Sequence, residues 1–165
     1  MKALIVYDSV FGNTAQVAQT LAAALETAVL PVNQVTPETL SGLDLLIIGS
    51  PTRGFRPTEN ISQLLNALAK NHLAGAGVAA FDTRIDLATI DSNVFRFIVD
   101  KGGYAASTIA KALEKKGGRL LAPPEGFLVT GEQGPLKDGE LARAAAWAKQ
   151  IALQDDSFLR QSFAA

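Results

Sequence analysis

Cysteine is absent from the 165 residues, and histidine, methionine and tryptophan each occur once. Without thiols there is no disulfide framework, no thiolate metal site and no cysteine nucleophile, so any redox chemistry needs a bound cofactor. An excess of one charge is also missing, because 15 basic and 16 acidic side chains give a net charge of −1. No long-range field then attracts nucleic acid or an anionic membrane, and neither is an expected partner.

Long apolar runs and metal-ligand patterns are missing too. Apolar runs are short, as at residues 45–48, against the ~18 residues that indicate a membrane span. The apolar N-terminus ends at Asp8, without the small-residue cleavage site of a signal peptide. The aspartates outside the strands lack the spacing of a metal loop, so no metal is expected. These absences favour a soluble cytoplasmic protein.

The chain has enough apolar residues, 48%, to build a substantial core. Its length is close to the ~150 residues of a typical domain, which predicts a single unit. We place this domain at residues 1–152. Residues 153–165 form a C-terminal tail that is expected to pack on the domain or on a second subunit, which leaves a homodimer open.

Strand-like and helix-like patterns alternate along the chain. Apolar runs typical of strands cover residues 3–7, 29–35, 43–49, 77–81 and 120–130, the last broken by Pro123-Pro124. Amphipathic helical stripes cover residues 13–28, 61–68, 106–113 and 141–152. This alternation predicts an α/β fold, a single doubly wound five-stranded parallel sheet with helices on both faces. A long connection at residues 84–101 is left over.

Ligands of such sheets bind beyond the carboxyl ends of the strands. The segment after the first strand combines hydroxyls at Ser9 and Thr14 with Gly12 and Asn13 at the start of a helix. Free N–H groups and the helix dipole make that place suited to an anion, held here without lysine or arginine. Alternatively, Asn13 or Thr14 caps the helix and Gly12 only makes the turn.

Other nucleotide-binding motifs do not match. No G-x-G-x-x-G follows a strand, and the stretch from Gly49 to Gly54 continues with Phe55 where a Walker motif requires lysine. Ser50 stands where a phospho-receiver domain has its acceptor aspartate. Dinucleotide-binding, ATPase and receiver functions are therefore disfavoured.

Three segments together resemble the flavodoxin family: residues 7–14, 49–52 and 81–84. The resemblance extends over about residues 1–152. It implies a flavodoxin-like fold with strand order 2-1-3-4-5 and non-covalent binding of FMN for electron transfer. The cofactor-binding residues it implies are Ser9, Val10, Phe11, Gly12, Asn13 and Thr14 at the phosphate, Pro51, Thr52, Arg53, Gly54 and Phe55 on one side of the isoalloxazine, and Asp82, Thr83 and Arg84 on the other.

The sequence departs from the family pattern at two places. Phe11 stands where family phosphate loops usually carry a hydroxyl residue, and only Phe55 offers an aromatic ring for stacking. Trp147 lies on the final helix, where a packing role is expected. The near-neutral charge also differs from the acidic character of flavodoxins, so docking by electrostatic steering is less expected.

Arg53, Arg56 and Arg84 follow strand ends. Each can pair with a nearby acid such as Glu59, Asp82 or Asp86 on a solvated rim. Alternatively, at least one lies near the flavin ring, where a guanidinium favours the anionic reduced form and raises the reduction potential. His72 is expected to contact free carbonyls at the end of a helix.

Three functions remain open on this sequence. The first is an FMN-binding electron carrier with no catalytic side chain, whose partners are redox proteins or small electron acceptors. The second is an NAD(P)H-dependent quinone or flavin reductase on the same fold. The third is an interaction module that has lost the flavin.

Overall fold

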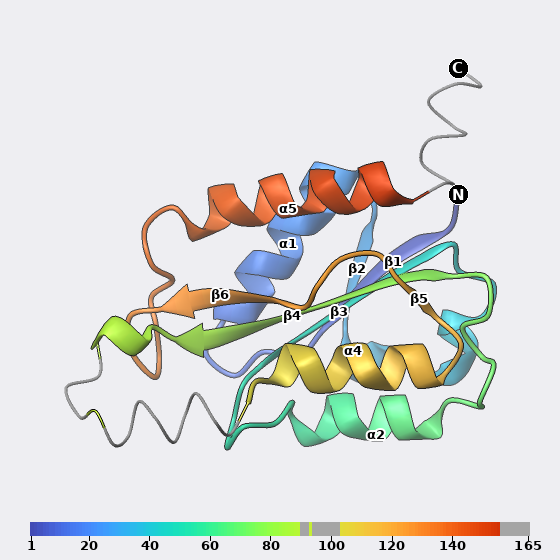
Figure 1. Cartoon of the computed structure of the whole chain (residues 1–165), viewed down its shortest axis with the longest axis horizontal. Helices are drawn as coiled ribbons and strands as arrows, with labels where there is room; N and C mark the ends of the chain where they lie inside the picture. The colour runs from blue at the N-terminus through green and yellow to red at the C-terminus, as the bar shows by residue number, and fades with distance from the viewer. Residues whose placement is uncertain (90–92, 94–102, 156–165) are drawn as a thin grey trace.

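A parallel sheet runs through the centre of the molecule, with helices on both of its faces (Figure 1). The structure is a computed structural model that describes residues 1–89, 93 and 103–155. Its elements in chain order are β1 (Ala3–Tyr7), α1 (Asn13–Leu25), β2 (Ala28–Pro31), η1 (Val32–Gln34), η2 (Pro37–Leu40), β3 (Leu45–Pro51), α2 (Glu59–Ala67), β4 (Gly77–Ile85), η3 (Leu87–Thr89), α4 (Ala105–Lys115), β5 (Arg119–Leu120), β6 (Glu125–Val129) and α5 (Glu140–Gln154).

The strand order is β2-β1-β3-β4-β5, which confirms the predicted doubly wound order. The predicted fifth strand is present as two. β5 pairs with the start of β4, and β6 pairs with its end, from Phe81 to Ile85. The break contains Pro123 and Pro124, and proline cannot donate to a strand ladder. Every pairing between these strands is parallel.

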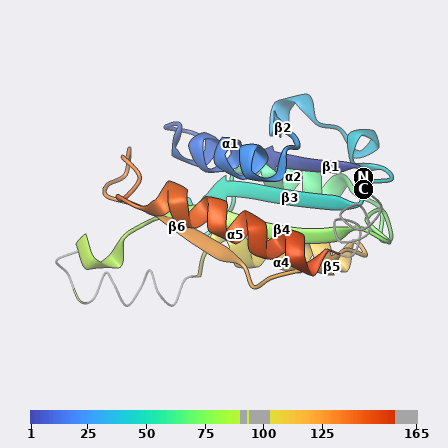
Figure 2. The ribbon, with the colours of Figure 1, turned by 90° about the horizontal axis from the view of Figure 1, so that it is seen from above.

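Alternate residues of the central strands bury against opposite layers of helix. On β1, Leu4 and Val6 belong to a core shared with α2 and α4, whereas Ile5 belongs to a core shared with α1 and α5. The two helix layers are visible on either side of the sheet in Figures 1 and 2. Because both faces are covered, the strands read as continuous apolar runs rather than alternating ones.

Trp147 packs in the core, as predicted. Its ring lies 6.2 Å from that of Phe81 and 5.9 Å from that of Phe127, edge to face in both cases. The Phe81 ring lies over Gly49 of the neighbouring strand β3, which has no side chain; a Cβ there would lie 2.0 Å from the ring. The cluster therefore fixes α5 against the end of the sheet that carries the cavity described below.

Several predicted boundaries were wrong. The strand expected at residues 29–35 ends at Pro31 and continues as a 3-10 turn, because proline leaves one position of the ladder without a donor. The helix expected to reach residue 28 ends at Leu25, where Glu26 adopts a left-handed φ of +51°. His72 contacts the carbonyl of Pro37 at 2.7 Å, not the end of its own helix.

The largest correction concerns Asp82, Thr83 and Arg84, which were expected in a loop but belong to β4. The strand extends beyond its apolar run because β3 pairs with it as far as Thr83 and β6 as far as Ile85. The predicted connection at residues 84–101 begins with the end of β4 and η3, and its remainder lies outside the described residues. Residues 156–165 of the predicted tail also lie outside them.

Candidate functional site

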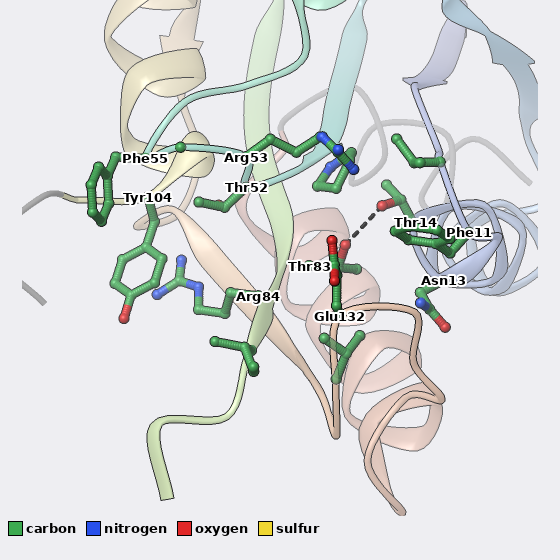
Figure 3. A pocket seen from close by; sticks show the side chains of 15 residues that line it. Phe11, Asn13, Thr14, Thr52, Arg53, Phe55, Thr83, Arg84, Tyr104 and Glu132 are labelled. Atoms are coloured by element: carbon green, nitrogen blue, oxygen red, sulfur yellow. Dashed lines mark hydrogen bonds between the residues drawn. The ribbon is translucent and has the colours of Figure 1, made fainter. Parts of the chain in front are cut away.

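A cavity opens at the carboxyl edge of the sheet, where β1, β3, β4 and β6 end (Figure 3). It encloses about 460 Å³, a size typical of small-molecule sites. Tyr7 pairs with Gly49 and Pro51 with Thr83, so the segments that follow these strands emerge side by side. The lining residues are Val10, Phe11, Asn13, Thr14, Pro51, Thr52, Arg53, Gly54, Phe55, Thr83, Arg84, Ile85, Tyr104, Val129 and Glu132.

The cavity gathers most of the predicted site residues. Only Ser9, Gly12 and Asp82 of that set do not line it; they support lining residues from behind. Sequence reasoning missed Ile85, Tyr104, Val129 and Glu132. A signal for them existed, since each lies at or just after the carboxyl end of a strand, or just before a helix that begins at the same edge.

The segment from Ser9 to Thr14 forms a loop of outward-facing backbone donors. Gly12 is the N-cap of α1 with φ +94°, a left-handed conformation suited to glycine. The Ser9 hydroxyl oxygen accepts from the N–H groups of Gly12 at 3.1 Å and Ala15 at 3.3 Å. Four further N–H groups find no acceptor among the described residues: those of Val10, Phe11, Asn13 and Thr14. Together with the dipole of α1, they suit an anion.

The hypothesis that Asn13 or Thr14 caps α1 is wrong. The helix has no side-chain cap at its N-cap residue. The Thr14 hydroxyl instead bonds the Thr83 hydroxyl at 2.8 Å, which ties α1 to β4. The Asn13 amide nitrogen donates to the carbonyl of Gln133 at 3.2 Å. The second part of the hypothesis, a turn at Gly12, is confirmed by its φ angle.

Asp8 and Ser50 brace the loops that carry the cavity. The Asp8 carboxylate accepts from the Ser9 N–H at 3.0 Å and from the Thr58 hydroxyl at 2.6 Å. The Ser50 hydroxyl accepts from the Thr58 N–H at 2.9 Å. These bonds close the segment between β3 and α2 against the end of β1, so Asp8 is a structural carboxylate here.

Residues 53–56 form a tight hairpin that carries two arginines. The Arg53 N–H donates to the Arg56 carbonyl at 2.8 Å, and the reverse bond measures 3.0 Å. The two central residues, Gly54 and Phe55, have φ of +54° and +67°, as a type I′ turn requires. For phenylalanine this conformation costs about 1–3 kcal/mol. The turn presents the Phe55 ring to the cavity.

Arg84 forms a rigid part of the cavity wall. Its Nε and Nη2 atoms donate to the two carboxylate oxygens of the fully buried Asp82 at 2.7 and 2.8 Å. The same carboxylate accepts from the N–H of Ala106 in the first turn of α4 at 2.9 Å. The Tyr104 ring covers the guanidinium at 3.5 Å. On the protein side, Gly126 leaves room for it, since a Cβ there would lie 2.2 Å from the Arg84 Cζ.

Arg53 differs from Arg84 in its partners. Neither Arg53 nor Arg56 forms an ion pair with any described carboxylate. The Arg53 guanidinium lies 6.0 Å from the centre of the Phe11 ring. The predicted pairing with an acid thus holds for Arg84, although its partner Asp82 is fully buried and not on a solvated rim. It is wrong for Arg53 and Arg56 within the described part of the chain.

Aromatic rings lie at both ends of the cavity. Figure 3 shows Phe55 and Tyr104 together at one end, and Phe11 beside Thr14 and Asn13 at the other. Phe55 and Phe11 are both exposed to solvent. Tyr104 supplies the second aromatic residue that the loop sequences lacked.

The loop after β6 closes the cavity beside Asn13. Gly134 packs against the Asn13 side chain so closely that a Cβ there would lie 2.6 Å from its Oδ1. Glu132 of this loop lines the cavity and forms no ion pair with a described residue. One carboxylate therefore faces the same space as Arg53.

An ion-pair network supports β6 from α5. Glu140 accepts from the Leu128 N–H at 2.7 Å and pairs with Arg143 at 2.7 Å. The hydrogen bond from Arg143 holds the pKa of the Glu140 carboxyl below its ordinary value. Arg143 also donates to the Gly126 carbonyl and lies over the Phe127 ring at 4.6 Å. This network positions Gly126 beneath Arg84.

Within residues 1–89, 93 and 103–155, no cluster of histidine, aspartate or glutamate is arranged to hold a metal ion. In that same part of the chain, no helix is long and apolar enough to cross a membrane.

The fold is that of a doubly wound α/β domain with a cavity at the carboxyl edge of its sheet. A model of the flavodoxin domain matches residues 4–124, and the chain belongs to this family. No curated protein sequence matches the chain significantly.

Solved structures share the fold. Oxidised flavodoxin 2 from Bacillus cereus superimposes with a TM-score of 0.73 at 20% identity, covering 93% of this chain and 99% of that one. A flavodoxin from the domain Archaea gives 0.68 at 20% identity, covering 94% and 99%. Rubredoxin oxygen:oxidoreductase from Desulfovibrio gigas gives 0.71 at 18% identity, covering 96% of this chain and 37% of that one.

Proposed function

We propose that this protein binds FMN non-covalently in the cavity and carries electrons with it. The observation that supports this most is the polarity of the cavity along its length. Unpaired backbone donors of the Ser9–Thr14 loop lie at one end, and the rings of Phe55 and Tyr104 lie at the other (Figure 3). FMN has the same polarity, with a phosphate at one end and a planar ring at the other.

The phosphate end fits the donors that the chain offers. The four unpaired N–H groups lie in the loop before α1 and in its first turn, and this 13-residue helix has no acidic residue in its first turn. An anion there gains hydrogen bonds and a favourable dipole interaction.

The ring end fits a flat, largely apolar group. Pro51, Phe55 and Tyr104 offer apolar surface and aromatic faces, which favour stacking. The Arg84 guanidinium lies between them and the sheet, and its bonds to Asp82 leave Nη1 free to donate. These side chains are arranged to orient a ring and to exclude water from one face of it.

FMN, when bound, supplies reversible one- or two-electron transfer. The protein's own contribution is then binding, orientation and electrostatics, with no side chain needed as an acid or base. Asp8 and Ser50 hold the two loops in register. We propose residues 1–152 as the domain that performs this role.

The test is the colour of the purified protein, followed by titration of the apo-protein with FMN. Bound flavin gives a yellow protein, and binding quenches flavin fluorescence in most such pockets. We expect one FMN per chain. A colourless protein that takes up no FMN would overturn the proposal and favour the flavin-free interaction module.

The proposed partners are redox proteins or small electron acceptors. One assay with the FMN-loaded protein distinguishes an electron carrier from an NAD(P)H-dependent quinone or flavin reductase. Steady oxidation of NADPH in the presence of a quinone is the result expected of the reductase. We expect no turnover above that of free FMN, as for a carrier that needs a separate donor.

A further inference from the structure

The two arginines that line the cavity carry very different effective charges. Arg84 is held by both oxygens of the buried Asp82 carboxylate, so the pair is close to neutral as seen from the cavity. Arg53 has no described carboxylate within ion-pair distance. Its positive charge is therefore available to a ligand.

The Arg53 side chain points toward one end of the cavity. In Figure 3 it extends from the hairpin toward Phe11 and Thr14, away from Phe55 and Tyr104. Its start is fixed, because the Arg53 backbone exchanges two hydrogen bonds with Arg56. The Thr52 N–H donates to the Thr83 carbonyl at 3.0 Å, which attaches the hairpin to β4. The charge thus lies at the donor end of the cavity.

That end lacks a charge of its own. The loop from Ser9 to Thr14 contains no lysine or arginine, and Phe11 brings a ring where a hydroxyl donor could have been. The unpaired donors are backbone N–H groups, which carry only partial charge. A phosphate monoester bears close to two negative charges at neutral pH, so a guanidinium from the neighbouring loop complements the N–H groups.

We propose that Arg53 is the phosphate-selective residue of this cavity: it supplies from the β3 hairpin the positive charge that the Ser9–Thr14 loop lacks. Arg84 acts differently, as a fixed part of the wall. This inference rests on the proposed function for the identity of the ligand. It predicts that Arg53 distinguishes FMN from riboflavin, which differ only in the phosphate.

The experiment titrates apo-protein with FMN and with riboflavin, following flavin fluorescence. Arg53→Gln is expected to weaken FMN binding about tenfold or more, the scale of one lost charge-assisted hydrogen bond, and to change riboflavin binding less than twofold. Arg53→Lys keeps the charge and is expected to recover part of the FMN affinity. Arg56→Gln is the matched control on the same hairpin, outside the cavity lining, and is expected to leave both Kd values within about twofold.

A second measurement needs no flavin. Inorganic phosphate is expected to raise the unfolding temperature of the wild-type apo-protein and to have a smaller effect on Arg53→Gln. Equal weakening of FMN and riboflavin in Arg53→Gln would overturn the proposal, because it would place Arg53 at the ring; unchanged FMN binding would overturn it as well.

The two measurements also separate this inference from the proposed function. If the wild type bound neither flavin, the proposed function would fail. The phosphate measurement would then still decide whether Arg53 binds the anion. A phosphate effect that Arg53→Gln left intact would overturn the role of Arg53 in that case also. Circular dichroism of each variant verifies that the fold is retained.

Discussion

The two ends of the cavity differ in how far the protein satisfies its own polar groups. At the Arg84 end, the buried Asp82 carboxylate is held by Arg84 and by the Ala106 N–H, and the Tyr104 ring stacks on the guanidinium, which leaves only Nη1 of Arg84 without a described hydrogen bond. At the Phe11 end, four backbone N–H groups have no described acceptor, and the Arg53 guanidinium has no described carboxylate partner. We call the Arg84 end the finished end and the Phe11 end the unfinished end; under the proposed function, a ligand supplies the partners that the unfinished end lacks.

This difference separates stability from affinity. Removing a partner at the finished end leaves a buried group without its bonds, which destabilises the folded state whether or not a ligand is present. Removing a donor at the unfinished end costs the folded protein little, because that donor was solvated, but weakens the complex. Variants at the two ends should therefore fall into two classes.

Asp82→Asn is expected to have the largest effect. It leaves the Arg84 guanidinium without its counter-charge beside a fully buried side chain. We expect a loss of about 3 kcal/mol in the free energy of unfolding, measured by urea denaturation of the apo-protein. The double variant Asp82→Asn/Arg84→Gln should lose less than the sum of the single variants. A loss below about 1 kcal/mol for Asp82→Asn would show that the finished end does not depend on this pair.

Glu140→Gln tests the support beneath that end. Its carboxyl pKa lies below the ordinary value of 4.5 because Arg143 donates to the charged form. A lowered folded-state pKa stabilises the protein above pH 4.5, and this contribution is lost as the pH falls further. We expect Glu140→Gln to lose about 1–3 kcal/mol at pH 7.

The difference from wild type should shrink as the pH falls below that value, which unfolding experiments at several pH values can measure. The Glu114→Gln variant removes an exposed carboxylate that has no described ion-pair partner, and it is the control for the loss of a surface charge. A stability difference for Glu140→Gln that stayed constant with pH would contradict the assignment of its effect to the Arg143 bond.

Gly126→Ala perturbs the finished end by volume alone. Its Cβ would lie 2.1 Å from the Arg84 Nε, so the guanidinium must leave its place between Gly126 and Tyr104. We expect a loss of about 1–2 kcal/mol in unfolding free energy, with FMN and riboflavin weakened by the same factor. Gly131→Ala, whose Cβ would meet only an ordinary contact at 3.5 Å, is the matched control. Selective weakening of FMN in Gly126→Ala would contradict the separation of the two ends.

The sequence predicted the fold and most of the cavity for one physical reason. Continuous apolar runs and amphipathic helical patterns identify the βα units. In a parallel sheet all strands point the same way, so their carboxyl ends lie at one edge. That rule placed Arg53, Phe55 and Thr14 at one edge without any contact information. The same rule covers Tyr104 and Glu132, which precede or follow elements at that edge, but the sequence analysis did not identify them.

What the sequence could not predict depends on contacts between distant residues. The extension of β4 through Asp82 and Arg84 depends on pairing with β6, more than 40 positions later in the chain. The sequence does not show which of Arg53 and Arg84 has a carboxylate partner, since both follow strand ends near acidic residues. Only the packed structure shows that Asp82 neutralises Arg84 and that Arg53 has no described counterpart.

Glu132→Gln sharpens the comparison with the smallest expected effect. This carboxylate shares the cavity with the donor end and has no described ion-pair partner, so it repels a phosphate there across solvent. Removing its charge should strengthen FMN binding about two- to fivefold at low ionic strength, and the gain should fall as salt screens the repulsion. Riboflavin carries no phosphate, so its Kd should stay the same within error.

Because Glu132 is exposed and forms no bonds that the fold depends on, unfolding stability should change by less than about 0.5 kcal/mol. Tighter binding of both flavins would instead mean that the side chain competes with the ring, and would move Glu132 from the donor end to the aromatic end of the cavity.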